Sequence, residues 1–318
     1  MGRHMRLLYI MDPVASILPD KDTTFALLRS AQRRGHENLH AGLSDLVLSG
    51  GRVRARARPV RVDSVPPWLE LGDEIDVPLA DLGAVLVRKD PPFDADYLYA
   101  TLLLEHARAD TVILNDPRAL RDANEKLYAL HFAELMPRTF VGAHRDSILG
   151  FVASVGGHAV IKPLDGAGGI GVLSLRIDDE NARGIVDVVS REGKRLAMVQ
   201  EYLPAVREGD KRILLLDGHP LGAILRVPRS DDLRSNIHVG GSVLPAELTE
   251  RDRMMVAAMA PRLRSDGLVF VGLDVIGGWL TEVNVTSPTG VQQLARFTGG
   301  APEDRVIEWI ERHARCQA

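Results

Sequence analysis

The sequence predicts an α/β protein in which a parallel α/β domain is followed by a small α+β module and a third section of strands and helices. Three observations lead to this fold class. Short apolar runs alternate with helical patterns over roughly the first 120 residues, as in a parallel sheet covered by helices. A glycine-rich turn in the middle of the chain joins two strand-like segments. Near the C-terminus, single acidic residues interrupt two apolar strands.

The composition limits the class of protein and its partners. A chain of 318 residues is long enough for two or three domains with buried cores. A net charge of −4 argues against nucleic acid or an anionic membrane as the main partner, and no apolar run reaches the ~20 residues that span a bilayer. The one cysteine, Cys316, excludes an intrachain disulfide and is consistent with a reducing compartment. We therefore expect a cytoplasmic protein with no nucleic-acid or membrane partner.

The first domain is expected over residues 5–121, because the four residues before Met5 read as an expression remnant. Its expected elements are a strand at 7–11, a helix at 23–34, a strand at 84–87, a helix at 97–109 and a strand at 111–114. Within residues 51–62, arginine occupies every second position from 52 to 58 and occurs again at 61. A strand with one solvated basic face explains this pattern better than a nucleic-acid contact, because the rest of the chain is not basic.

The second and third domains are expected over residues 122–201 and 202–318. Asp122 and Glu125 have the spacing of a capping box, which predicts a helix from Asp122 to about Leu135. Further strands are expected at 159–162, 172–177, 196–200, 212–216, 222–227, 269–276 and 279–285, with helices at 181–191, 249–264 and 302–315.

The stretch KPLDGAGGIGV, residues 162–172, contains the G-x-G-x-x-G pattern and fits several classes of nucleotide-binding protein. In a Rossmann dehydrogenase this turn opens a helix, but residues 172–177 alternate as a strand does. A protein kinase would carry H-R-D and D-F-G motifs downstream, and the chain has neither. An ordinary tight turn would not need five small or polar residues beside a lysine. We therefore interpret the glycines as a flap over ATP, with Lys162 supplying charge for phosphate.

Residues 270–276 and 279–285 predict a β-hairpin that carries metal ligands. Glu282 and Asn284 are two residues apart and share a face of their strand. A two-residue turn would place Asp274 on the opposite face from Glu282, and a three-residue loop over 277–279 would pair the two acids. We predict the three-residue loop. Carboxylate and amide oxygens suit Mg²⁺ that bridges phosphates.

Three arginines are candidates for binding carboxylate or phosphoryl oxygens. Arg212 opens an apolar strand, Arg226 closes another, and Arg234 lies in a polar loop. Arginine is usually a solvated surface charge. The first two, however, stand at the ends of apolar strands, where we expect the guanidinium group to bind two oxygens of a carboxylate or phosphoryl group. Residues 199–204 form a link that presents backbone groups to an adenine edge, or acts as a simple linker.

Several motifs in order along residues 7–298 resemble the bacterial glutathione synthetase family of ATP-grasp ligases. They are MDPVASILPDKDTTFALLRSAQRRGH, VRKDPPFD, LRDANEKLY, IKPLDGAGG, YLPAVREGDKR, FVGLDVIGG and TEVNVTSPTG. The resemblance implies an ATP-grasp fold, with ATP held between the middle and C-terminal domains, and a homotetramer. It also implies the substrates γ-glutamylcysteine and glycine.

The resemblance assigns roles to individual residues. The implied ATP contacts are Lys126, Lys162, the flap residues Gly166, Gly168 and Gly169, the hinge residues Gln200, Glu201, Tyr202 and Leu203, and Asp210 near the ribose. The implied ligands of two Mg²⁺, or Mn²⁺, are Asp274, Glu282 and Asn284. The implied catalytic residues are Arg212, Arg226 and Lys162. The implied peptide-binding residues are Asp12, Arg212, Arg226, Arg234, Asn236 and Ser287.

The chain departs from the family pattern at two places on the substrate side. Gln292 and Gln293 stand where the family has Arg-Glu, and Ser235 stands where glycine is usual. Three hypotheses follow: a glutathione synthetase, a related ligase with a different acyl donor or amine acceptor, and a nucleotide-binding regulatory protein without catalysis. The third would require the loss of a phosphate-binding or metal-binding residue, and each position retains its expected type.

Overall fold

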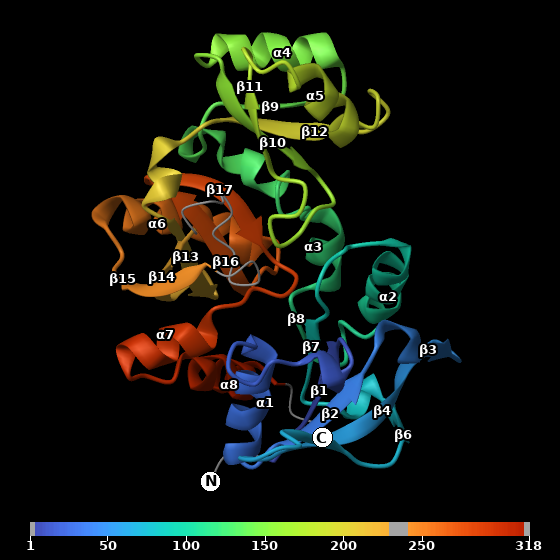
Figure 1. Cartoon of the computed structure of the whole chain (residues 1–318). Coiled ribbons are helices and arrows are strands. Elements are labelled where there is room, and N and C mark those ends of the chain that lie inside the picture. Colours follow the sequence, from blue (N-terminus) through green and yellow to red (C-terminus); the bar gives the residue numbers. More distant parts are fainter. Residues whose placement is uncertain (1–3, 229–240, 315–318) are drawn as a thin grey trace.

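The computed structural model describes residues 4–228 and 241–314, which form three sheets covered by helices. Figure 1 shows the C-terminal sheet lying between the N-terminal sheet at the bottom and the middle sheet at the top. Arg234, Ser235, Asn236 and Cys316 lie outside the described residues. Short 3₁₀ segments lie at η1 (Val14–Ser16), η2 (Leu43–Asp45), η3 (Leu79–Asp81) and η5 (Pro204–Arg207). Within the described ranges, no helix has the length and apolar character needed to cross a membrane.

The N-terminal sheet has the parallel centre that the sequence predicts. Strand β1 (Arg6–Met11) pairs in parallel with β2 (Glu37–Ala41) and β7 (Ala84–Arg88), and β7 pairs in parallel with β8 (Val112–Leu114). Helices α1 (Thr23–Arg33) and α2 (Ala95–Glu105) follow β1 and β7. The Asp22 carboxylate caps α1 by accepting from the N–H groups of Thr24 and Phe25. These elements confirm the expected strands and helices of this region.

Antiparallel strands extend this sheet, and the sequence predicted only one of them, the basic strand within residues 51–62. The added strands are β3 (Leu46–Ser49), β4 (Arg52–Val62), β5 (Leu69–Leu71) and β6 (Ile75–Pro78). Strand β4 alternates buried apolar residues with outward arginines, as predicted. Arg54 pairs with Asp76 at 2.8 Å, and Arg61 pairs with Glu70 at 2.6 Å. Neighbouring acids therefore neutralise much of the basic face.

The expected helix from Asp122 to Leu135 is wrong. Asp122 is the last residue of α3 (Pro117–Asp122), and the following segment forms the 3₁₀ stretch η4 (Tyr128–Leu135). The Glu125 side chain accepts hydrogen bonds from Val285 and Thr286 instead of closing a capping box. The segment that follows β17 thus takes the carboxylate that the local pattern assigned to a helix start.

The middle sheet is antiparallel, in the order β11-β10-β12-β9. Its strands are β9 (Thr139–Gly142), β10 (His158–Pro163), β11 (Leu173–Arg176) and β12 (Ala197–Glu201), with helices α4 (Arg145–Ser154) and α5 (Ala182–Ser190). The sequence predicts β10, β11, β12 and α5 but misses β9 and α4. One core cluster joins both helices to this sheet through Ile148, Val186 and Ile161.

The C-terminal sheet has the order β15-β14-β13-β16-β17. Its strands are β13 (Asp210–Leu216), β14 (His219–Val227), β15 (Ser242–Ala246), β16 (Phe270–Ile276) and β17 (Trp279–Asn284); the helices that follow or cover it are α6 (Glu250–Ser265), α7 (Val291–Thr298) and α8 (Pro302–His313). Strand β15 and helix α7 were not predicted. Figure 1 shows α7 and α8, in red, beside the blue α1. Arg34 and Glu311 pair there at 2.7 Å, so the last helix docks on the first domain.

Candidate active site

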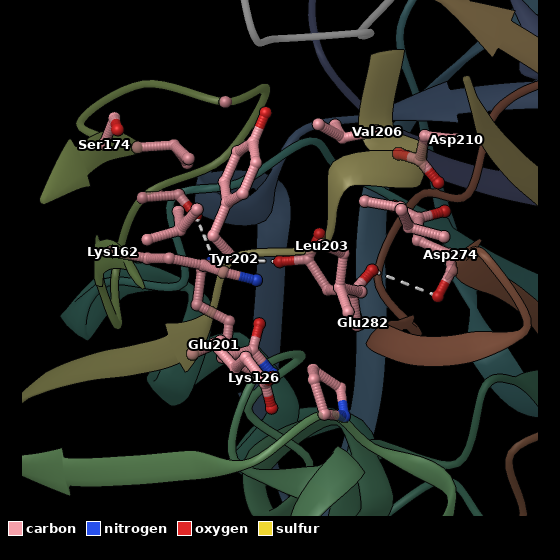
Figure 2. Close-up of a pocket in the computed structure, with 18 of the residues that line it drawn as sticks. Lys126, Lys162, Ser174, Glu201, Tyr202, Leu203, Val206, Asp210, Asp274 and Glu282 are labelled. Carbon is pink, nitrogen blue, oxygen red and sulfur yellow. Dashed lines mark hydrogen bonds and ion pairs between the residues drawn. The ribbon is translucent and has the colours of Figure 1, made fainter. Parts of the chain in front are cut away.

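A pocket lies between the middle sheet and the C-terminal sheet. Figure 2 shows Lys162 and Tyr202 on one side of it and Asp210, Asp274 and Glu282 on the other. The structure brings together, in the lining of this pocket, the predicted nucleotide residues Lys126, Lys162, Gly166, Gly168, Gly169, Gln200, Glu201, Tyr202, Leu203 and Asp210, and the acids Asp274 and Glu282. Residues from two sheets that are separate in the sequence therefore face one cavity.

The glycine flap connects β10 to β11, so a strand follows the turn, as predicted. Gly168 and Gly169 adopt φ angles of 62° and 80°, which residues with a Cβ atom disfavour. A Cβ on Gly166 would approach the Ile170 carbonyl oxygen to 2.7 Å. The flap backbone therefore needs these glycines in order to lie over the pocket.

Two lysines reach the pocket in different electrostatic states. Lys126 Nζ donates to the Gly166 carbonyl at 2.5 Å and pairs with Glu282 at 2.9 Å. Burial opposes the charge of Lys126, but Glu282 outweighs it and raises the pKa. Within residues 4–228 and 241–314, the Lys162 ammonium makes no hydrogen bond or ion pair, and burial lowers its pKa despite the nearby Glu282. Lys162 is therefore a half-buried lysine whose ammonium donors face the pocket.

The β16–β17 hairpin pairs Asp274 with Glu282, as predicted, but by a different route. Ile276 pairs with Trp279, so the turn has two residues and the predicted three-residue loop is wrong. Gly277 and Gly278 have φ angles of 57° and 81°, as a tight hairpin turn requires. A bulge at Thr281, whose hydroxyl donates to the Asp274 carbonyl at 3.1 Å, shifts the register. The bulge places both acids on the pocket side.

Two arginines hold the Asp274 carboxylate. Arg212 donates to it at 2.5 and 3.0 Å, and Arg226 lies 2.9 Å from it. Arg226 also pairs with Asp210 at 2.5 Å. Burial opposes ionisation of Asp274, but the two guanidinium groups outweigh it and hold the pKa well below its ordinary range. The predicted catalytic arginines therefore lie directly behind a predicted metal ligand.

The donor set fits Mg²⁺. Asp274 and Glu282 bring carboxylate oxygens to one pocket from paired strands, and magnesium prefers such hard ligands together with phosphate oxygens and water. Asn284 is not in the lining, and its amide nitrogen donates to the Gly272 carbonyl at 3.3 Å. Among the described residues, no three His, Cys, Asp or Glu side chains form a metal cluster by themselves.

The predicted peptide side lies where β1 and β7 end. Asp12 pairs with Lys89 at 2.9 Å and accepts from the Asp90 N–H at 2.9 Å. The Ser287 hydroxyl donates to the Arg88 carbonyl at 3.4 Å. Asp12 and Ser287 therefore both contact the segment 88–90. Sequence reasoning missed Lys89, although the motif VRKDPPFD contains it.

The unusual glutamines are not in the lining of the pocket between the middle and C-terminal sheets. Gln292 donates to the carbonyls of Pro19 and Asp22 at 2.7 and 2.6 Å, which ties α7 to the start of α1. Gln293 is buried beside it, and its Oε1 accepts no hydrogen bond from the residues described. Gln292 therefore links α7 to the segment before α1 by hydrogen bonds.

Two family models match the chain. One describes the N-terminal domain of prokaryotic glutathione synthetase and matches residues 5–121; the other describes its ATP-grasp domain and matches residues 125–299. The glutathione synthetase of Thermosynechococcus vestitus is 45% identical over 317 residues, covering 96% of this chain and 99% of that protein. The glutathione synthetase of Pseudomonas putida is 45% identical over 318 residues, covering 98% and 99%.

Solved structures with low sequence identity share the fold. The D-cycloserine synthetase DcsG superposes with a TM-score of 0.66 at 17% identity, covering 96% of this chain and 99% of that one. The ATP-grasp ligase PsnB, complexed with a variant precursor, Mg and ADP, gives 0.62 at 15% identity, with coverage of 99% and 100%. The two family models and the two relatives at 45% identity show that the chain belongs to the prokaryotic glutathione synthetase family of ATP-grasp ligases.

Proposed function

We propose that the chain joins γ-glutamylcysteine to glycine and converts ATP to ADP and phosphate. The observation that carries this proposal is the pocket in which Lys162 keeps free donors beside the carboxylates of Asp274 and Glu282. Such a site suits a nucleotide whose phosphates bring both negative charge and metal-binding oxygens. Family membership supports ligation as the use of that nucleotide.

The reaction needs an activated acid, because a carboxylate is a poor electrophile. In our proposal the cysteinyl carboxylate attacks the γ-phosphorus of ATP, the bond from that phosphorus to the β–γ bridging oxygen breaks, and ADP leaves. The glycine amine then attacks the acyl phosphate, phosphate departs, and the amine loses a proton. Lys162 and Lys126 neutralise phosphate oxygens, and Arg212 and Arg226 stabilise the reacting phosphoryl and carboxyl groups.

We propose that Asp274, Glu282 and Asn284 hold two Mg²⁺, with Mn²⁺ as a substitute. The ions would neutralise phosphate charge and help to orient the phosphates. Asp274 is kept ionised by its two arginines, and Glu282 is shared with Lys126. Asp274 therefore enters the reaction as a carboxylate.

We propose that γ-glutamylcysteine binds at Asp12, Ser287, Arg234 and Asn236. We also propose three domains, at residues 5–121, 122–201 and 202–318, a division that agrees with one sheet in each section. A homotetramer follows from the family resemblance. A cytoplasmic location is consistent with the single cysteine.

The test is a panel assay of ADP release. The purified chain receives ATP, Mg²⁺ and combinations of acyl donors and amines, with each component omitted in turn. We expect turnover that depends on γ-glutamylcysteine and on glycine, with glutathione as the product. Turnover only with another donor or amine would favour the related ligase that Gln292, Gln293 and Ser235 suggest. No turnover with any pair would favour the regulatory protein.

A further inference from the structure

Glu125 holds the backbone at the point where β17 ends. Its Oε1 accepts hydrogen bonds from the Val285 N–H at 3.0 Å, from the Thr286 N–H at 3.2 Å and from the Thr286 hydroxyl at 2.8 Å. Its own carbonyl oxygen accepts a fourth, from the Val283 N–H at 2.9 Å. One residue from a distant part of the chain therefore holds the backbone on both sides of Asn284.

The residues beside Glu125 hold the flap. The Asn124 side chain donates to the Leu164 carbonyl at 3.0 Å, and Lys126 donates to the Gly166 carbonyl at 2.5 Å. Lys126 also pairs with Glu282 at 2.9 Å. The segment 124–126 thus contacts the glycine flap and the strand that carries the metal ligands. A displacement of this segment would move both walls of the pocket.

We propose that Glu125 is a positioning residue that sets the place of Glu282, Asn284 and Lys126 for the metal–nucleotide complex. Glu125 itself is not in the lining of the nucleotide pocket, so it acts through these neighbours. Groups that orient metal ligands often matter nearly as much as the ligands themselves. This inference rests on the proposed function, because it assumes that Mg²⁺ and a nucleotide meet at β17.

The contacts indicate that the role depends on hydrogen-bond acceptance. All three partners of Oε1 are donors, and the amide oxygen of glutamine can accept from the same donors. Alanine cannot, and it would leave buried N–H groups without a partner. Glu125→Gln therefore separates positioning from a role of the negative charge, such as direct metal ligation.

The experiment measures ADP binding by titration calorimetry over a series of Mg²⁺ concentrations, without peptide substrates. The proteins are the full chain and the variants Glu125→Ala, Glu125→Gln, Thr286→Val and Glu311→Ala, each with its Tm. Glu311→Ala is the control, because it removes a half-buried ion pair with Arg34, far from β17.

We expect Glu125→Ala to raise the Mg²⁺ concentration for half-maximal ADP binding by about 10- to 100-fold. Glu125→Gln should stay within about threefold of the parent, because it keeps the acceptor, and Thr286→Val should fall between the two. The control, Glu311→Ala, should have a lower Tm than the parent and the same Mg²⁺ requirement for ADP binding.

Two results would overturn the inference. One is a Glu125→Ala variant with a lower Tm but an unchanged Mg²⁺ requirement for ADP binding. The other is a Glu125→Gln variant whose Mg²⁺ requirement rises as much as that of Glu125→Ala. If alanine prevents folding, an unchanged Mg²⁺ requirement in Thr286→Val contradicts it instead. A parent chain that binds ADP with Mg²⁺ but shows no turnover in the panel assay would contradict the proposed function alone.

Discussion

At the residue scale, burial and partners decide what each charge is available to do. Lys126 and Lys162 stand near the same acid, but only Lys126 forms an ion pair with Glu282. Burial lowers the pKa of Lys162, whereas Glu282 raises that of Lys126. Because a desolvated cation interacts strongly with an incoming anion, Lys162 is the side chain that we expect to matter most for phosphate binding.

Replacing Lys162 by alanine should lower kcat/KM by about 10²- to 10³-fold, as the loss of a preorganised charge at a reacting group does. In the parent chain, kcat/KM for ATP should decrease as pH rises, and the decrease should begin at a pH lower than 10.5, the ordinary pKa of lysine. The reason is that burial lowers the pKa of Lys162, so this side chain loses its proton at a lower pH than an exposed lysine does. Steady-state assays across pH check both effects. Lys194→Ala, at an exposed ion pair with Glu192, is the control. An alanine variant as active as this control would contradict the role.

At the element scale, the β16–β17 hairpin shows how a turn and a bulge act together. The two-residue turn alone would separate Asp274 from Glu282, since side chains alternate along a strand. The extra residue, Thr281, restores the pairing. The sequence showed the hairpin and its acids, but it did not distinguish a longer loop from a bulge, because both add one residue to the same strand.

Gly277→Ala should destabilise this hairpin. The φ of Gly277 is 57°, and a Cβ there would lie 2.9 Å from the Ala205 Cβ. We expect a loss of about 1–3 kcal/mol in the free energy of unfolding, measured by urea denaturation. Gly184→Ala in α5 is the matched control, since its Cβ meets open space and should gain about 1 kcal/mol. Equal effects at the two glycines would contradict the turn geometry.

At the scale of the whole molecule, the C-terminal helices join the last domain to the first. Arg34 pairs with Glu311, and Gln292 donates to two carbonyls before α1. Asn115, after β8, also bonds the backbone of Phe270 and Val285. These contacts set the position of the N-terminal sheet, and with it Asp12, relative to the nucleotide pocket.

Glu311→Gln should lower Tm at neutral pH by about 2–4 °C if the lost pair is worth about 1 kcal/mol. The hydrogen bond from Arg34 lowers the pKa of Glu311, so its contribution is fully present above the ordinary value of 4.5 and is lost as pH falls below it. The Tm difference between variant and parent should therefore disappear in acid. Scanning calorimetry at several pH values checks this, and a difference that persists unchanged at low pH would contradict it.

By itself, the sequence determined the α/β class, the flap between two strands and the chemical types of the residues that line the pocket. These follow from local periodicity, from the conformational freedom of glycine and from side-chain chemistry. Only the tertiary structure decided the role of Glu125, the bulge at Thr281 and the docking of Gln292. The contacts of Glu125 and Gln292 depend on partners far along the chain, and a local pattern such as the capping box at Asp122 carries no information about which distant backbone will compete for the same carboxylate. The bulge at Thr281 is local, but a longer loop would add the same residue to the strand.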